Sequence, residues 1–256
     1  MQKKISVVIP AYNEEEYLGA TLDALSLQTF PRTDFEIVVV DNASTDQTSI
    51  IARTHGADKI IFESTKGTNQ ARQTGLNHAE GIMIAFLDAD CIAPPDWLER
   101  IDASLTQHGD SCAAVAGAYS FPCEITDSLY VMEKVYRWVV LPAVNTVMGR
   151  FLKRGGVIIG GNFASFKENL QKINGLDTSF TFFGDDASIA KNFGKLGCVH
   201  YDPKLFVVSS TRRFDREGLL KTNWEYTKNY LRVMFRPEID LVNASVCRFM
   251  KTKSKN

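Results

Sequence analysis

The first hundred residues alternate between short apolar runs and longer segments in which apolar residues recur at helical spacing. The apolar runs predict buried strands at residues 5–10, 35–41, 59–62 and 82–88. The helical spacing predicts helices at residues 14–27, 45–55 and 69–79. Strands that alternate with helices are typical of an α/β fold, so we expect a mainly parallel, twisted, Rossmann-like sheet flanked by helices.

The remaining residues continue this pattern less regularly. Apolar runs predict further strands at residues 113–119, 157–159 and 206–209. Helices are predicted from 97 to about 107, over 127–154 with a break at Pro142, and over 221–236. We therefore expect one domain with two halves, residues 1–100 and 101–215. Amphipathic helices and a basic tail follow at residues 216–256.

Composition narrows the class of protein. The 256 residues are 45% hydrophobic and carry a net charge of −1, so we expect a large core and no nucleic-acid partner. The five cysteines are scattered without a Cys-x-x-Cys pair, which predicts neither a disulfide framework nor a zinc site. We expect a cytoplasmic protein, because no signal peptide precedes the first strand and no apolar stretch is long enough to span a membrane.

Two aspartates end the fourth predicted strand. In the segment GIMIAFLDAD, residues 81–90, the apolar run stops at Asp88, and Asp90 follows one residue later. Open α/β sheets bind ligands at the carboxyl ends of their strands. Two carboxylates so close repel one another unless a cation or a hydrogen-bond network lies between them. Mg²⁺ or Mn²⁺ carrying a diphosphate would suit them, although a pair of exposed turn aspartates has the same sequence.

The turn after the first strand excludes several cofactor classes. Its sequence, PAYNEEE, has neither the G-x-G-x-x-G pattern of dinucleotide-binding folds nor a phosphate-binding P-loop. This argues against NAD, FAD and P-loop chemistry. Asp41 ends the second strand, where a carboxylate can accept a hydrogen bond from a base or a ribose hydroxyl. A loop with a helix cap is the structural alternative.

Four blocks in order resemble glycosyltransferase family 2, the inverting transferases of GT-A fold. They are SVVIPAYNEEEYL, VVVDNASTDQT, KGTNQARQTGLNHAEGIMIAFLDAD and FFGDDASIAKNFGKLG, within about residues 4–100 and 155–210. The resemblance implies a nucleotide-sugar donor and a divalent cation, Mn²⁺ or Mg²⁺. The Gln/Arg-x-x-Arg-Trp block of the family's processive synthases is absent, which predicts transfer of a single sugar.

The resemblance also implies roles for single residues. The residues implied in donor binding are Pro10, Ala11, Tyr12, Glu14, Asp41, Lys66, Gly67, Arg72, Asp88, Ala89 and Asp90. Asp41 would read the base, and Asp90, with Asp88 beside it, would bind the metal. Gly161 and Asn162 would let the backbone approach the donor sugar, although a plain turn explains them equally well.

A second carboxylate pair, Asp185 and Asp186, opens a predicted helix. The family usually has Glu-Asp here, with the second residue as general base, so the resemblance implies that Asp186 is the base and Asp185 its neighbour. Acids also cap helices well, and both interpretations can hold together. Arg212 or Arg213 would cover the diphosphate as a clamp, since guanidinium groups match phosphate. A solvated basic turn is the alternative.

Two segments suggest where the acceptor binds. Residues 130–154 and the C-terminal residues from 219 onward combine aromatic and aliphatic residues with Lys and Arg. Basic amphipathic helices can lie in a membrane interface, which predicts a peripheral protein on the cytoplasmic face and a lipid-linked acceptor. Alternatively these faces pack on the sheet or form a homo-oligomer seam, and packing is the favoured interpretation for residues 221–236.

The sequence thus predicts a metal-dependent inverting transferase. It would move one sugar from a UDP- or GDP-sugar, GDP-mannose among them, to an acceptor hydroxyl or phosphate. Two alternatives remain open: a non-catalytic sugar-nucleotide-binding module and a nucleotidyltransferase. The acids at 88, 90, 185 and 186 argue against the module, and the PAYNEEE turn, which lacks a glycine-rich basic loop, argues against the nucleotidyltransferase.

Overall fold

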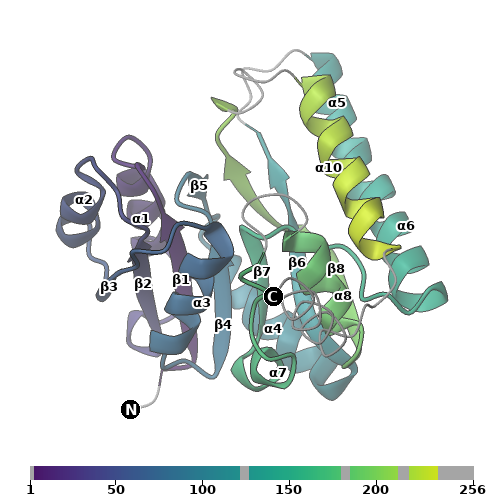
Figure 1. Ribbon diagram of the computed structural model, residues 1–256, viewed down its shortest axis with the longest axis horizontal. Helices are drawn as coiled ribbons and strands as arrows, with labels where there is room; N and C mark the ends of the chain where they lie inside the picture. Colours follow the sequence, from purple (N-terminus) through teal and green to yellow (C-terminus); the bar gives the residue numbers. More distant parts are fainter. Residues whose placement is uncertain (1–2, 122–126, 180–184, 213–218, 236–256) are drawn as a thin grey trace, which may run out of the picture.

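The computed structural model describes residues 3–121, 127–179, 185–212 and 219–235 (Figure 1). In the described residues, eight strands form one sheet in the order β3-β2-β1-β4-β7-β6-β8-β5. The strands are β1 Ile5–Ala11, β2 Phe35–Asp41, β3 Lys59–Phe62, β4 Met83–Leu87, β5 Cys91–Ile92, β6 Cys112–Ser120, β7 Asn162–Phe166 and β8 Cys198–Ser209. Strands from both expected halves of the domain therefore share one sheet.

The strand directions decide which loops meet. Strands β3, β2, β1 and β4 are parallel, as are β6 and β8, so the expected mainly parallel sheet is confirmed. Strand β7 runs antiparallel between β4 and β6, and β5 runs antiparallel to β8. Because Leu87 pairs with Asn162, the end of β4 lies beside the residues that precede β7. Asp88 and Gly161 are thereby brought together.

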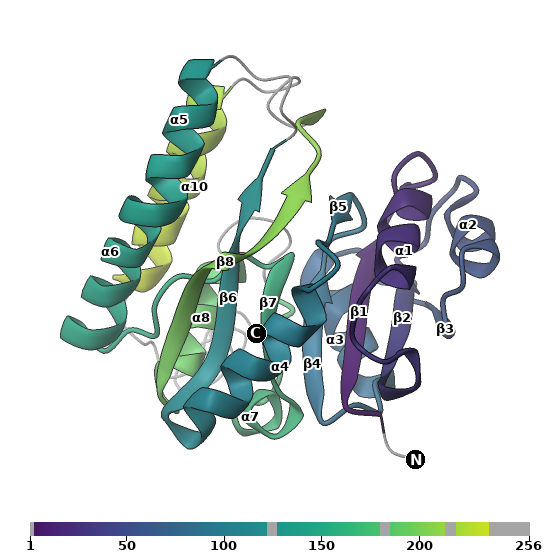
Figure 2. The ribbon, with the colours of Figure 1, turned by 180° about the vertical axis from the view of Figure 1, so that it is seen from behind.

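Helices cover both faces of the sheet (Figures 1 and 2). They are α1 Leu18–Ser26, α2 Thr48–Thr54, α3 Thr68–His78, α4 Trp97–His108, α7 Lys167–Lys172 and α8 Asp185–Phe193. Side chains alternate along a strand, so Val7 packs into the core under α1 and α4, whereas Val8 packs into the core under α3 and α8. This two-faced burial explains the nearly continuous Val and Ile runs of the sequence.

A long helical segment stands at the side of the molecule farthest from β3 (Figure 1). It consists of α5 Asp127–Val135, a π-helical turn Tyr136–Val140, α6 Leu141–Thr146 and a second π-helical turn Val147–Phe151. The expected break at Pro142 is wrong. Pro142 lies in the first turn of α6, directly after a π-helical turn, where its missing N–H is tolerated.

The C-terminal helix α10 Leu219–Met234 packs against α8, in line with the interpretation that the sequence favoured for it. Its Met234 is fully buried, and the Tyr230 hydroxyl donates a hydrogen bond to the Gly156 carbonyl at 2.9 Å. In the described part of the chain, no helix is both long and apolar enough to cross a membrane. The basic tail beyond residue 235 lies outside the described residues.

One expected strand is wrong. Residues 157–159 are extended and mostly buried but pair with no strand among the described residues, and the strand that follows, β7, begins at Asn162. The backbone turns at Gly155 and Gly156, which have φ angles of 85° and 135°. The Val157 N–H then donates to the side chain of Asn145 on α6 at 2.8 Å. Val157 packs between Leu141 of α6 and the strand residues Ala118 and Tyr201, so this run lies against the sheet without being part of it, which a hydrophobic pattern cannot distinguish from a strand.

Candidate active site

Five acids and two arginines lie close together where β4 ends. Asp88 and Asp90 follow β4, Glu14 follows β1, and Asp185 with Asp186 begins α8. The arginines come from different elements: Arg72 from α3 and Arg212 from the segment after β8. If all seven side chains are ionised, their formal charge is −5 + 2 = −3, so the electrostatics favour an added cation.

Arg72 bridges the two aspartate pairs. Its Nη2 lies 2.9 Å from Asp88 Oδ1, and its Nη1 lies 3.2 Å from Asp185 Oδ2. The side chain is only 3% exposed, and its Nε has no hydrogen-bond partner in the described residues. Burial lowers the pKa of Arg72, but Asp88, Asp185 and Asp186 together raise it well above the ordinary value, so the guanidinium stays charged. The two pairs are thus held in one fixed arrangement.

Two glycines let the backbone approach both pairs. A Cβ on Gly161 would lie 2.2 Å from Asp88 Oδ2, and a Cβ on Gly160 would lie 2.3 Å from Asp186 Oδ1. The two glycines lie in a turn closed by the hydrogen bond from the Asn162 N–H to the Ile159 carbonyl at 2.8 Å, and any side chain at these positions would also displace a carboxylate. The Tyr119 hydroxyl donates to Asp88 Oδ2 at 2.6 Å. Sequence analysis missed Tyr119, which lies on β6 and follows no motif.

The two carboxyl groups at the start of α8 differ in their surroundings. Burial and then the neighbouring Asp185 together raise the pKa of Asp186 to about 8, against the opposing effect of Arg72. Burial also raises the pKa of Asp185, but its ion pair with Arg72 counters the rise. Of the two carboxyl groups, Asp186 therefore keeps its proton to the higher pH. A carboxyl group whose pKa lies near neutrality suits proton transfer.

Asp90 belongs to a second cluster. Its Oδ2 accepts a hydrogen bond from Ser210 Oγ at 2.5 Å and lies 3.2 Å from Arg212 Nε. The same guanidinium donates to both Glu14 oxygens, at 2.7 and 2.5 Å, and stacks over the Tyr17 ring with 4.8 Å to its centroid. Burial raises the pKa of Asp90, and Asp88 adds to the rise. A cation at Asp90 would oppose both effects.

The donor atoms at Asp90 fit a divalent cation. In the described residues, Asp90 Oδ1 has a single weak partner, the Cys91 thiol at 3.8 Å, so a hard carboxylate oxygen is available. Asp88 fits less well, because both its oxygens already accept hydrogen bonds from Arg72 and Tyr119. No group of three or more His, Cys, Asp or Glu side chains in the described residues could hold an ion. Further ligands would have to come from substrate and water.

A second set of predicted residues gathers at the ends of β1 and β2. Tyr12 is 48% exposed, and Lys66 Nζ lies 3.3 Å from the centroid of its ring. Asp41 is buried and accepts hydrogen bonds from the Ser44 N–H at 2.9 Å and from the Ser49 hydroxyl. The two serines fix the Asp41 carboxylate, and an exposed aromatic ring such as that of Tyr12 suits contact with a planar base.

Asn42 shapes this second set but was missed by sequence analysis. Its Nδ2 donates to the carbonyls of Glu63 and Thr65, and its Oδ1 accepts from the N–H of Gly67 at 2.8 Å. Gly67 has a φ of 148° and precedes α3. One buried amide therefore fixes the loop that carries Lys66. Its place in the DNAS segment beside Asp41 was the available signal.

The remaining predicted residues divide into backbone supports and one interior residue. Pro10 and Ala11 end β1, and the Ala89 carbonyl accepts a hydrogen bond from Thr21 Oγ1 at 2.8 Å. Asn162 is 0% exposed, and its amide is bonded to Trp97 Nε1, the Ala118 carbonyl and the Leu205 carbonyl. Its side chain therefore joins α4, β6 and β8 beneath the site. Arg213 lies outside the described residues.

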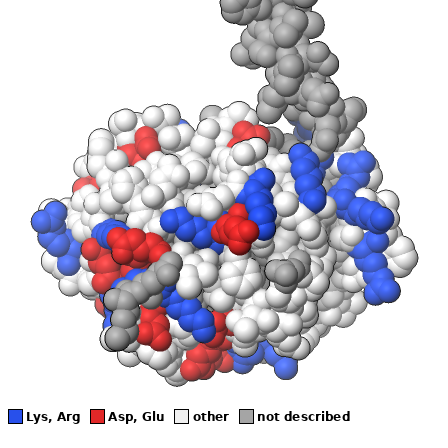
Figure 3. Space-filling view, turned by 90° about the horizontal axis from the view of Figure 1, so that it is seen from below, with Lys and Arg blue, Asp and Glu red and all other residues white. Residues whose placement is uncertain are grey.

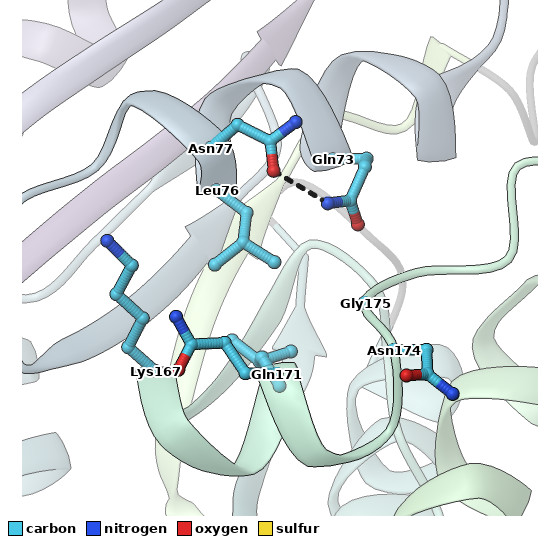
Figure 4. A pocket seen from close by; sticks show the side chains of 8 residues that line it. Gln73, Leu76, Asn77, Lys167, Gln171, Asn174 and Gly175 are labelled. Atoms are coloured by element: carbon cyan, nitrogen blue, oxygen red, sulfur yellow. Dashed lines mark hydrogen bonds between the residues drawn. The ribbon is translucent and has the colours of Figure 1, made fainter.

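A separate pocket of about 340 Å³ opens between α3 and α7, and none of the acids above lines it (Figure 4). Gln73 donates to Asn77 Oδ1 at 2.9 Å and accepts from the Leu176 N–H at 2.8 Å. Gly175 has a φ of 76°, and a Cβ there would lie 2.3 Å from Gln73 Oε1. These contacts hold the chain that leads towards α8 against α3, the helix that carries Arg72.

Comparison with known proteins identifies the family to which this chain belongs. The family model described as glycosyl transferase family 2 matches residues 6–173, which is more than half of the chain, and the chain belongs to this family. Glycosyltransferase AglE from Haloferax volcanii is 35% identical over 123 residues, 46% of this chain and 40% of that protein. Poly(ribitol-phosphate) β-N-acetylglucosaminyltransferase TarS from Staphylococcus aureus is 36% identical over 110 residues, 41% of this chain and 19% of TarS. The chain thus spans less than half the length of these relatives.

Solved structures confirm the predicted fold. Mannosyltransferase PcManGT from Pyrobaculum calidifontis, in complex with GDP-Man and Mn²⁺, has a TM-score of 0.62 at 23% identity, with 82% of this chain and 57% of that chain covered. Glucosyl-3-phosphoglycerate synthase from Mycobacterium tuberculosis, with Mn²⁺, UDP-glucose and phosphoglyceric acid, has a TM-score of 0.59 at 22% identity. There, 93% of this chain and 81% of that chain are covered. At these identities the likeness is one of fold.

Proposed function

We propose that this protein transfers one sugar from a nucleoside-diphosphate sugar to an acceptor hydroxyl or phosphate, with inversion at the anomeric carbon. One observation carries the proposal: two aspartate pairs lie on either side of the buried Arg72, with the bare backbone of Gly160 and Gly161 against them. This arrangement places carboxylates with separate tasks side by side on a fixed backbone. Family membership and the folds with GDP-Man and UDP-glucose support a nucleotide-sugar donor.

In this proposal Asp186 is the general base. An acceptor oxygen attacks the anomeric carbon, the bond from that carbon to the diphosphate oxygen breaks, and Asp186 takes the acceptor proton. The raised pKa of Asp186, caused first by burial, supports this role, because a base must be able to hold the proton that it removes. Asp185 and Arg72 position Asp186 and tune its pKa.

The donor would lie across the ends of β1, β2 and β4. Tyr12, Asp41 and Lys66 would hold the base, and Asp88 with Arg72 would lie beside the ribose and diphosphate. Asp90 would hold a divalent cation, with Asp88 close by, and that ion would offset negative charge on the departing nucleoside diphosphate. Arg212 would then contribute guanidinium hydrogen bonds to the diphosphate.

The helical segment 127–152 supports a lipid-linked acceptor at a membrane surface. Its outer side exposes Tyr130, Val131, Met132, Val135, Tyr136, Trp138, Val139, Val140, Val147, Phe151 and Leu152. Residues 134–167 contain no Asp or Glu, and neither do residues 187–201 on and after α8. Arg150, Lys153 and Lys195 are exposed in these acid-free stretches. In Figure 3, basic side chains without acidic neighbours gather towards the right, the side on which α6 lies in Figure 1.

An apolar surface next to basic residues matches an anionic membrane interface. Aromatic and aliphatic side chains insert at headgroup level, and each nearby Lys or Arg contributes about 1 kcal/mol at an anionic surface. So many exposed apolar residues on one helical segment are uncommon in proteins that stay monomeric in solution. A lipid-linked acceptor would then reach the acid clusters from this surface.

The test of transfer is incubation with a panel of UDP- and GDP-sugars and Mn²⁺, with the released nucleotide identified. Release of nucleoside diphosphate in the presence of a polyprenyl phosphate or glycolipid supports the proposal. Release of pyrophosphate from a nucleoside triphosphate and a sugar phosphate would favour a nucleotidyltransferase. Donor binding without turnover on any acceptor would favour a binding module.

The test of the membrane surface is flotation with neutral and anionic phospholipid vesicles. We expect the full chain to float with anionic vesicles, and less so in high salt. The double change Trp138→Ser and Phe151→Ser should weaken flotation, because Phe151 is 72% exposed on this segment. Phe62→Ser is the matched control, since Phe62 is 68% exposed but lies on β3, at the opposite end of the sheet. A chain that stays unbound to anionic vesicles would contradict this part of the proposal.

A further inference from the structure

Arg212 connects the loop after β1 with Asp90, the carboxylate proposed to hold the metal. Its Nη atoms donate to both oxygens of Glu14, which belongs to the loop after β1, while its Nε lies 3.2 Å from Asp90 Oδ2. Glu14 and Arg212 are 198 residues apart in the chain. A single guanidinium is therefore shared between the carboxylate best suited to a metal and a carboxylate of the donor loop.

The two arginines of the site differ in their freedom to move. Arg72 is 3% exposed and is fixed between Asp88 and Asp185. Arg212 is 35% exposed, and its main attachments are the two carboxylates and the face of the Tyr17 ring. If Arg212 moved away, Asp90 would still accept its hydrogen bond from Ser210, so the carboxylate would keep its orientation. Arg212 can thus leave without the site losing its shape.

A guanidinium and a divalent ion cannot share Asp90 without repelling each other. An anionic diphosphate removes the conflict, because it offers the guanidinium new acceptors and offsets the charge of the ion. Glu14 holds Arg212 in a bidentate pair that any ligand must replace. Free metal brings no such replacement, whereas a metal bound to a diphosphate does.

We propose that Arg212 is an internal counter-ion of Asp90 that makes the site select the metal–diphosphate complex against free metal. Without donor, Arg212 occupies Asp90 Oδ2 and Glu14. When metal and diphosphate arrive together, Arg212 leaves Asp90 for the diphosphate, and the metal binds the Asp90 carboxylate. This inference rests on the proposed function for its metal and diphosphate, and it adds a discriminating role for one named residue.

The test compares Mn²⁺ binding with and without nucleotide in Arg212→Gln, Arg212→Lys and the wild type. Free and bound Mn²⁺ are distinguished by electron paramagnetic resonance, and affinities for UDP and GDP with Mn²⁺ are measured by calorimetry. We expect Arg212→Gln to bind Mn²⁺ alone more tightly, on the order of tenfold, because a repelling charge is removed. The same variant should bind Mn²⁺ with UDP or GDP more weakly. Arg212→Lys keeps the charge and should bind Mn²⁺ alone as the wild type does.

Arg100→Gln is the matched control, because Arg100 pairs with Asp96 on the surface of α4 and contacts none of the site acids. It should leave both affinities unchanged. An Arg212→Gln protein that remains folded but binds Mn²⁺ alone no more tightly than the wild type would overturn the inference, and so would equal weakening of both affinities. If the wild type transfers no sugar, the proposed function fails while the comparison with metal alone still stands. If the wild type transfers sugar but Arg212→Gln shows no gain, only this inference fails.

Discussion

Gly161→Ala is a minimal change that tests whether the backbone must approach the Asp88 carboxylate. A Cβ at this position would lie 2.2 Å from Asp88 Cγ and 2.3 Å from the Tyr119 hydroxyl. Neither neighbour can yield freely, because Asp88 is bonded to Arg72 at 2.9 Å and to Tyr119 at 2.6 Å. The substitution therefore forces the carboxylate out of its place.

The size of the effect follows from these contacts. Forcing an extra methyl into a packed region costs about 1–3 kcal/mol, and displacement of Asp88 also removes one or both of its hydrogen bonds. If the strain falls on the donor site, affinity for the nucleotide falls about 5- to 100-fold, since about 1.4 kcal/mol corresponds to a factor of ten. The strain is divided between the free native protein and its nucleotide complex. The free energy of unfolding should therefore fall by a similar amount.

The assay is calorimetric binding of UDP and GDP with Mn²⁺, together with urea denaturation. Gly197→Ala is the matched control, because its nearest neighbour is the Ser111 carbonyl oxygen at 3.3 Å, far from the acids. We expect the control to change stability by less than about 1 kcal/mol and to leave binding unchanged. Normal nucleotide binding and stability in Gly161→Ala would refute the reasoning.

Further predictions concern the metal, the pH dependence and Asp88. Asp90→Asn should abolish the Mn²⁺ dependence of nucleotide binding, and calorimetry that shows unchanged metal dependence would contradict the assignment of Asp90. Because burial and then Asp185 raise the pKa of Asp186 to about 8, its ionised form grows with pH, so kcat/KM should rise from neutral pH towards that value. Asp185→Asn should move this rise to lower pH, and an unshifted profile would exclude Asp186 as the titrating base. Tyr119→Phe removes one hydrogen bond to Asp88 and should lower the free energy of unfolding in urea by about 1 kcal/mol. A loss near zero would argue against a hydrogen bond between Tyr119 and Asp88.

The first half of the fold could be predicted from sequence because β1, β2 and β4 are buried on both faces. The run at residues 35–41 became β2 with its predicted bounds, and the strand that precedes Asp88 ended within one residue of its predicted end. Prediction failed where burial came from another source. Residues 157–159 are buried between α6 and the sheet without joining it, and Pro142 lies within a continuous helical run because a π-helical turn precedes it.

The site could be predicted only where a short motif carries it. Asp88 and Asp90 are marked by the end of a strand, and Asp185 and Asp186 by the start of a helix. The residues that hold these acids in place come from distant strands and leave no local pattern. Tyr119 lies on β6, 31 residues from its partner, and Ser210 is 120 residues from Asp90. The hydrogen-bond state of Asn162 likewise depends on three elements that meet only in the folded chain.

The central claim, that the acids beside Arg72 carry out sugar transfer, is tested most directly by Asp186→Asn. The measurement is turnover on a nucleotide sugar that the wild type accepts, with donor affinity measured in parallel. Loss of general base catalysis alone should lower kcat by about 10²- to 10⁴-fold while donor affinity stays near that of the wild type. Turnover at the wild-type rate in both Asp186→Asn and Asp185→Asn would contradict the account, because neither carboxylate would then be the base that accepts the proton.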